Sequence, residues 1–294
     1  MALKFPRYVL SGAAFPGHSA ADLVAEARAL DLDAIDLVIA PGGQVDPSAA
    51  IDLIEVTVDC ADAGARVVMV TTDLTSPFDD HAEDIHRGCR EARVPFIRYG
   101  AWSRIHGASY LDSLQAARAG LRGLETLCRR HDLRALVRQM PGSLQEQSGH
   151  AATLLHGRLP GYVGICLAPG DLGPMAPQAW RLDLDALHHH VQALSITNSA
   201  LVSGPHGWSR TPATLTDGVS DWPRLLDELT RRDLDVFAVL EGRYNTGPVW
   251  SHGPDPQPNP HSLLQDDLRL VRRCLGARPV RRQSNKPRRW YRPL

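Results

Sequence analysis

The stretch YVGICLAPGDL, residues 162–172, shows the pattern from which the fold can be predicted. Its first seven residues are almost all apolar, and Pro169 and Gly170 then favour a tight turn. A short apolar run that ends at turn residues is typical of a strand buried on both faces. The stretch therefore predicts a strand of a parallel sheet covered by helices.

Seven further runs of the same kind precede or follow this one, at 7–12, 33–40, 65–72, 94–100, 133–139, 191–197 and 235–241. Longer amphipathic segments separate them, which indicates parallel strands joined by right-handed crossovers. Eight such units in 294 residues predict an α/β protein with a (β/α)8 TIM-barrel fold. A doubly wound open sheet is the alternative, but LSGAAFPGHS, after the first run, lacks the GxGxxG spacing.

The segments between the strands begin with recognisable helix caps. A Ser or Asp followed by a proline, or by an acid or amide three residues on, is typical of a helix start. Such starts occur at Ser19, Asp46, Ser76, Ser109, Asp221 and Ser262. The helix after Asp46 is expected to carry Ile51, Ile54 and Val58 as its apolar positions. Weaker patterns predict helices at about 145–158 and 175–190.

Composition excludes several classes of protein. The net charge is −1, which gives no overall attraction to nucleic acid or membrane, and no apolar run is long enough to span a bilayer. The five cysteines are odd in number and widely spaced, and the first ten residues lack the apolar core of a signal peptide. We therefore expect reduced thiols and a cytoplasmic protein.

The domain prediction is a single barrel over residues 1–280, followed by a basic tail over 281–294. The tail has six basic residues and no acid, a composition that can contact nucleic acid, but no nucleic-acid partner is expected. A mobile tail or one that docks on another subunit is favoured instead, which leaves a homodimer open.

In a TIM barrel the active site forms where the strands end, so residues at those positions are the candidates. The strand ends and the loops that follow them supply Glu241, Arg98, Arg138, Gln139, Asn198, Arg243, Tyr99, Trp102, His18, His106 and His206. Three strand-end arginines favour a carboxylate or phosphate ligand, because a guanidinium binds such anions through two hydrogen bonds.

The order of these segments resembles the xylose isomerase-like TIM barrels, the superfamily of sugar isomerases and epimerases. The similar segments are LVAEARALDLDAIDLVI (23–39), VPFIRYGAW (94–102), LETLCRRHDLRALVRQ (124–139), GICLAPGDL (164–172) and DWPRLLDELTRRDLDVFAVLEG (221–242). They cover nearly the whole chain.

The resemblance implies a metal site built from Glu, Asp, His and Glu at the ends of strands five to eight. Such ligands suit Mn, Mg, Co or Zn. The matching positions here hold Arg138, Ala168, Ser195 and Glu241, and an alternative alignment of strand five offers Gln139. Only Glu241 keeps a family ligand, so the prediction is a degenerate site with no metal and no cofactor. A redirected metal site using His18, Asp73 and Glu241 is a further alternative.

The resulting hypothesis is a metal-independent acid–base enzyme acting on a small polar, anionic metabolite. The resemblance points to an isomerase or epimerase, or to a related lyase or cyclase. Glu241 is predicted as the base and His18 or His206 as its acid. The predicted substrate-binding residues are Arg98, Arg138, Gln139, Asn198, Arg243, Tyr99, Trp102 and His106. Two alternatives stay open: Glu241 is only a structural partner of an arginine, or the barrel is a non-catalytic protein that binds a metabolite or a partner protein.

Overall fold

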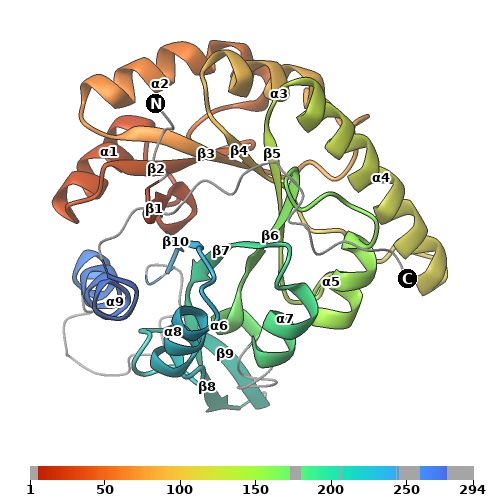
Figure 1. Ribbon diagram of the computed structural model, residues 1–294. Coiled ribbons are helices and arrows are strands. Elements are labelled where there is room, and N and C mark those ends of the chain that lie inside the picture. The colour runs from red at the N-terminus through yellow and green to blue at the C-terminus, as the bar shows by residue number, and fades with distance from the viewer. Residues whose placement is uncertain (1–5, 173–179, 206, 243, 245–258, 277–294) are drawn as a thin grey trace.

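The computed structural model describes residues 6–172, 180–205, 207–242, 244 and 259–276. Eight parallel strands close into a barrel in the order β1-β10-β7-β6-β5-β4-β3-β2, as Figure 1 shows. Their bounds are β1 Tyr8–Ser11, β2 Ala34–Ile39, β3 Arg66–Thr72, β4 Phe96–Arg98, β5 Arg134–Arg138, β6 Val163–Leu167, β7 Val191–Ile196 and β10 Phe237–Leu240. All eight predicted strands are present, and β1 pairs with β10 through Leu10 and Leu240 to complete the ring. The predicted (β/α)8 barrel is confirmed.

The helices surround this barrel and pack on its outer face (Figure 1). The main helices are α1 Ala20–Ala29, α2 Leu53–Asp62, α3 Ala82–Glu91, α4 Tyr110–Arg130, α5 Ser148–Leu155, α7 Trp180–Leu187, α8 Trp222–Arg231 and α9 Pro260–Leu275. Shorter elements are the 3-10 helices η1 Gly12–Ala14 and η2 Pro47–Asp52 and the four-residue α6 Pro169–Leu172. No helix in the described part of the chain is both long and apolar enough to cross a membrane.

Several helix starts follow the sequence patterns. Ser19 and Asp22 form the expected capping box of α1, and Ser109 accepts a hydrogen bond from the Asp112 backbone at the start of α4. Asp221 caps α8 in the same way through the Arg224 backbone. A side-chain oxygen in these positions satisfies a backbone N–H that the first turn of a helix leaves unpaired.

Two helix starts differ from prediction. Ser76 begins no helix, because the Asp79 carboxylate accepts from the backbone N–H of Thr75 and of Ser76 and folds this segment into a turn; α3 starts only at Ala82. The last helix begins before Ser262, because Asn259 supplies the cap and Pro260 fits the first turn.

The apolar positions expected after Asp46 were assigned to the wrong face. Ile51, Ile54 and Val58 are 43%, 40% and 51% exposed, whereas Leu53 and Cys60 are buried. The reason is that α2 carries apolar residues on both faces, and the stripe that packs on the core runs through Leu53, Val56 and Cys60.

A β-hairpin after β7 was not predicted. It consists of β8 Asn198–Gly204 and β9 Gly207–Ala213, which pair in antiparallel register outside the barrel wall (Figure 1). Its far end exposes Leu201, Val202 and Trp208. Its near end lies at the carboxyl ends of the barrel strands, where it borders the site described below.

The barrel interior has two layers. The lower layer is apolar and includes Val9, Met69, Phe96, Leu136 and Phe237, with the rings of Phe96 and Phe237 5.2 Å apart. The layer above it, toward the carboxyl ends of the strands, carries charged and hydroxyl side chains. A polar layer inside a barrel is costly unless its members are paired, so its contacts decide what the site can do.

Candidate functional site

The polar layer is organised by Arg98 from β4, whose side chain is fully buried. Its two terminal nitrogens donate to the two carboxylate oxygens of Glu241, at 2.9 and 3.0 Å, and one of them also donates to Asp36 at 3.1 Å. Ser11 and Thr71 donate their hydroxyls to Asp36, and Thr71 also accepts from Arg98 Nε. Every charge in this cluster is therefore paired inside the barrel.

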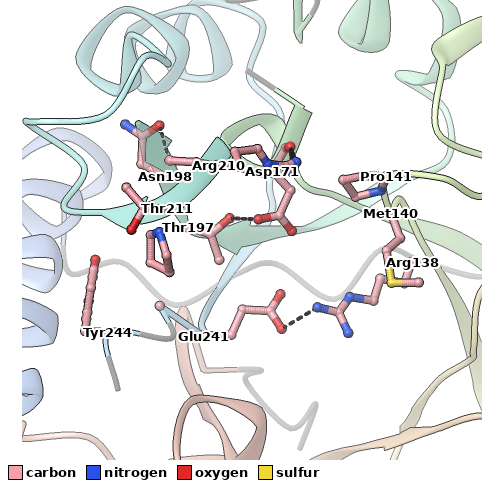
Figure 2. Close-up of a pocket in the computed structure, with 13 residues that line it drawn as sticks. Arg138, Met140, Pro141, Asp171, Thr197, Asn198, Arg210, Thr211, Glu241 and Tyr244 are labelled. Atoms are coloured by element: carbon pink, nitrogen blue, oxygen red, sulfur yellow. Dashed lines mark hydrogen bonds and ion pairs between the residues drawn. The ribbon is translucent and has the colours of Figure 1, made fainter. Parts of the chain in front are cut away.

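Glu241 has a second cationic neighbour. Arg138, at the end of β5, places a terminal nitrogen 3.5 Å from the Glu241 carboxylate, as Figure 2 shows. Burial alone would raise the pKa of Glu241, but Arg98 and then Arg138 outweigh it, and the pKa falls to about 2. Glu241 is thus a permanent carboxylate at neutral pH.

Arg138 makes fewer contacts with other side chains than Arg98 does. Its side chain is 16% exposed, and its only ion pair among the described residues is the 3.5 Å contact with Glu241. Its Nε is buried and has no hydrogen-bond partner within the described structure. Because Arg98 binds both oxygens of Glu241, that carboxylate does not depend on Arg138 for its pairing.

These residues do not fit the metal that the fold family implies. Of the four matching positions, Arg138 is a cation, Ala168 has no donor and the Ser195 hydroxyl is neutral. The remaining one, Glu241, has both oxygens bound by guanidinium groups. Across the described residues no three His, Cys, Asp or Glu side chains gather into a metal-binding group.

Directly above the polar layer lies a cavity of about 250 Å³. Its charged and hydroxyl-bearing lining residues come from five different parts of the chain, namely Arg138, Asp171, Thr197, Ser199, Arg210, Thr211, Glu241 and Tyr244. Figure 2 shows the carboxylates of Asp171 and Glu241 on neighbouring sides of this cavity, with Arg138 facing Glu241. A cavity with a few convergent charged groups at this end of a barrel is the expected place for a ligand.

Asp171 is positioned by the short helix α6. Gly170 is essential there, because an added Cβ would lie 1.7 Å from the carbonyl oxygen of Thr197. This close approach brings Asp171 beside the end of β7, where its carboxylate accepts a hydrogen bond from the Thr197 hydroxyl at 3.0 Å. The acid absent from position 168 is thus supplied three residues later, from a helix instead of the strand.

The pKa of Asp171 is raised. Burial is the largest cause and the negative charge of Glu241 the second, while Arg138, the Thr197 hydrogen bond and Arg210 act in the opposite direction. A carboxyl group whose pKa is shifted toward neutrality can both accept and donate a proton. Asp171 and Glu241 therefore differ in chemistry although they share one cavity.

The hairpin supplies one wall of the cavity. Arg210 on β9 donates from both terminal nitrogens to the backbone carbonyl of Asp171 and so ties the hairpin to α6. Asn198 fixes the hairpin's base: its amide donates to the carbonyls of Leu215 and Ser220, and its side-chain oxygen accepts from the Ser199 and Ser220 backbones. Asn198 borders the cavity as expected, but its polar atoms are already engaged.

Three predicted substrate-binding residues lie away from the cavity. Tyr99 faces outward from β4, where its hydroxyl contacts His86 at 2.7 Å and Cys128 at 3.1 Å. Trp102 is buried and donates to the Thr75 carbonyl. Gln139 is buried and its amide is fully engaged with Glu146, Asp183 and Ala168.

Two of the three predicted histidines, His18 and His106, are not brought to the cavity either. His18 lies in the loop after β1, 4.0 Å from Glu26, and His106 is exposed in the loop after β4. Asp73 lines a separate cavity, so His18, Asp73 and Glu241 do not form the alternative metal site. His206 and Arg243 fall outside the described residues.

Several cavity residues were not among the predicted site residues, and Asp171, Thr197 and Arg210 are the ones that bear on the chemistry of the cavity. Thr197 is the last residue of the run at 191–197, and Asp171 lies three residues beyond the run at 162–168, so a wider window at each strand end would have included both. Arg210 could not have been found in this way, because it is contributed by the unpredicted hairpin.

The sequence and the fold differ in how well they match known proteins. No protein-family model matches the sequence, and no curated protein matches it. Among solved structures, a xylose isomerase-like TIM barrel protein from Mycobacterium smegmatis in complex with magnesium has a TM-score of 0.65 at 15% identity, covering 92% of this chain and 98% of that one.

Two similar structures carry names of enzymes. The 3-keto-D-glucoside 4-epimerase YcjR from E. coli has a TM-score of 0.65 at 14% identity and covers 92% of this chain and 100% of its own. The probable 3-DHS dehydratase AsbF from Bacillus anthracis has a TM-score of 0.64 at 17% identity, with coverages of 90% and 98%. The fold of this protein is therefore that of the xylose isomerase-like TIM barrels.

Proposed function

We propose that this barrel is an isomerase- or epimerase-like enzyme that moves protons on a small, polar, anionic metabolite without a metal ion. In this proposal Asp171 is the acid–base group and Arg138 binds the substrate's anionic group. Glu241 keeps a fixed negative charge beside them. A lyase that removes a proton and a leaving group from the same kind of substrate would use the same groups.

The acid–base role passes from Glu241 to Asp171 because of their different surroundings. A carboxylate with a pKa of about 2 is a weak base at neutral pH. Asp171 lacks a guanidinium partner within ion-pair distance in the described structure, and its raised pKa brings it closer to the working range. Its hydrogen bond from Thr197 holds the carboxylate toward the cavity.

The anchoring role rests on Arg138 and not on Arg98. Arg98 is fully buried, and five hydrogen bonds tie it to the carboxylates of Glu241 and Asp36 and to the hydroxyls of Ser11 and Thr71. Arg138 borders the cavity, is partly exposed and retains unused donors. A planar guanidinium of this kind suits a carboxylate or a phosphate.

The fold supports the reaction class. The names of two similar structures are those of an epimerase and a probable dehydratase, and we extend that class of chemistry to this chain as part of the proposal. The observation that carries the proposal is the cavity at the carboxyl ends of the strands, which is lined by both the carboxyl group of Asp171 and the guanidinium of Arg138.

The test is solvent deuterium exchange. The protein is incubated in D₂O with a panel of small sugar acids, oxo acids and sugar phosphates, and carbon-bound deuterium is measured by NMR. We expect exchange in at least one compound. Asp171→Asn keeps the shape of the side chain but removes its acid–base function, and its rate should fall ~10²–10⁴-fold.

Asp62→Asn serves as a matched control, because Asp62 is exposed on α2 and the substitution changes the net charge equally. Undiminished exchange in the Asp171 variant would refute the assignment of this residue. Binding of panel compounds without any exchange would favour the alternative of a barrel that binds a metabolite and does not transform it.

A further inference from the structure

The two carboxylates that share the cavity are held very differently. Glu241 receives two hydrogen bonds from Arg98 and a 3.5 Å contact from Arg138. Asp171 receives one hydrogen bond from the neutral hydroxyl of Thr197. Arg210 contacts the backbone carbonyl of Asp171 and, within the described structure, makes no ion pair with its carboxylate. Asp171 is therefore the cavity carboxylate that is free to gain a proton.

The charges that face Asp171 come from three strands. Glu241 on the β10 side favours the protonated form, as burial does. Arg138 from β5 and Arg210 from β9 favour the ionised form, together with the hydroxyl of Thr197 after β7. Together these groups hold the pKa of Asp171 above its ordinary value, so the loss of one cationic contribution would raise that pKa further.

An anion bound to Arg138 would remove such a contribution. It would neutralise the field of that guanidinium at Asp171 and add a negative charge to a cavity of about 250 Å³. Like charges in a confined, weakly screened space oppose each other, and proton uptake by one group relieves the repulsion.

We infer that an anion binding at Arg138 brings a proton with it, which is taken up by the carboxylate of Asp171. This inference rests on the proposed function, because it uses the same anion site. The proton comes from solvent and forms an O–H bond on Asp171. In turnover it is then donated to an oxygen of the substrate, and a later proton transfer from the substrate or solvent restores Asp171.

The consequence is that the substrate generates its own general acid. Before binding, Asp171 can be ionised and the cavity holds a free base; after binding, the same residue is a proton donor. A neutral molecule of equal size would not cause this change. The coupling is reciprocal, so protonation of Asp171 must strengthen anion binding by the same factor.

Isothermal titration calorimetry with sulfate tests the inference. Sulfate stays a dianion from pH 5.5 to 8.5, so its own titration does not interfere. We expect Kd to rise with pH, by at most tenfold per pH unit within the range where Asp171 titrates. Measurement at one pH in two buffers of different ionisation enthalpy should show uptake of up to one proton per sulfate bound.

Three variants test which residue takes up the proton and which residue binds sulfate. Asp171→Asn should bind sulfate with an affinity that no longer changes with pH and should take up no proton, whereas Asp62→Asn should behave as the native protein does. Arg138→Gln should lose sulfate binding. All titrations are made at constant ionic strength, because screening alone changes the affinity of exposed charges.

Different results would overturn the anion site at Arg138 and its coupling to the protonation of Asp171. Sulfate binding that depends on Arg138, but is independent of pH and releases or takes up no proton, overturns the coupling and leaves the anion site standing. Proton uptake that persists in Asp171→Asn also overturns it. Sulfate binding that is equal in Arg138→Gln and the native protein, or absent in both, overturns the anion site and the coupling together.

Discussion

Replacement of Glu241 by glutamine tests the buried charge cluster. The variant keeps the shape of the side chain but leaves Arg98 with Asp36 alone and deprives Arg138 of its carboxylate partner. A buried cation that loses its partner is strongly destabilising. We therefore expect the free energy of unfolding at pH 7 to fall while the barrel stays folded.

The magnitude follows from the pKa of Glu241. It drops from an ordinary value of 4.5 to about 2 in the folded protein, a difference of about 2.5 units. At 1.36 kcal/mol per unit this amounts to about 3 kcal/mol, at the lower end of the ~3–5 kcal/mol found when a buried pair is broken. Because the folded pKa is the lower one, this stability is fully present above pH 4.5 and is lost as the pH falls toward 2.

The assay is urea unfolding of the native protein and Glu241→Gln between pH 7 and pH 3. The difference in unfolding free energy should be largest at neutral pH and shrink below pH 4.5. Glu228→Gln is the matched control: Glu228 also pairs with two arginines, Arg231 and Arg232, but at the solvent-exposed surface of α8, where water screens the pairs. A Glu241 variant as stable as the native protein at pH 7 would refute the reasoning.

Two further predictions concern the stability of the protein in acid and its metal content. Burial lowers the pKa of His86 from 6.5 to about 4, so between these pH values the folded protein keeps the ring neutral while the unfolded chain protonates it. The free energy of unfolding should therefore fall by up to about 3 kcal/mol from pH 6.5 to pH 4. In urea unfolding, His86→Gln should lessen this dependence of the unfolding free energy on pH. An unchanged slope would show that other groups cause it. Since a guanidinium, a methyl group and a hydroxyl occupy three of the four family ligand positions, protein dialysed against chelator should keep its melting temperature; one equivalent of Mn, Co or Zn retained through dialysis, seen by mass spectrometry, would contradict this.

The barrel itself could be predicted from the sequence because its signals are local. Eight apolar runs bounded by turn residues predicted eight buried strands, and their alternation with amphipathic segments predicted a parallel closed sheet. Caps such as Ser19 and Ser109 marked helix starts, since a cap satisfies backbone groups within a few residues of itself. In α2, where both faces carry apolar residues, the same reasoning assigned the wrong face to the core.

The direction of each strand-end side chain was decided only by the tertiary structure. Arg98 and Tyr99 are adjacent at the end of β4, yet one points into the barrel and pairs with Glu241 while the other points out to His86. Strands buried on both faces carry no alternation of polar and apolar residues, so the sequence cannot tell which side faces inward.

The site depended on contacts between distant segments. Asp171 reaches the cavity because Gly170 lets α6 approach Thr197, and Arg210 arrives on a hairpin that the sequence pattern did not reveal. The sequence by itself determined the barrel and the presence of charge at its strand ends. Which charges neutralise one another was decided by packing, because pairing depends on distances across the barrel that no local pattern encodes.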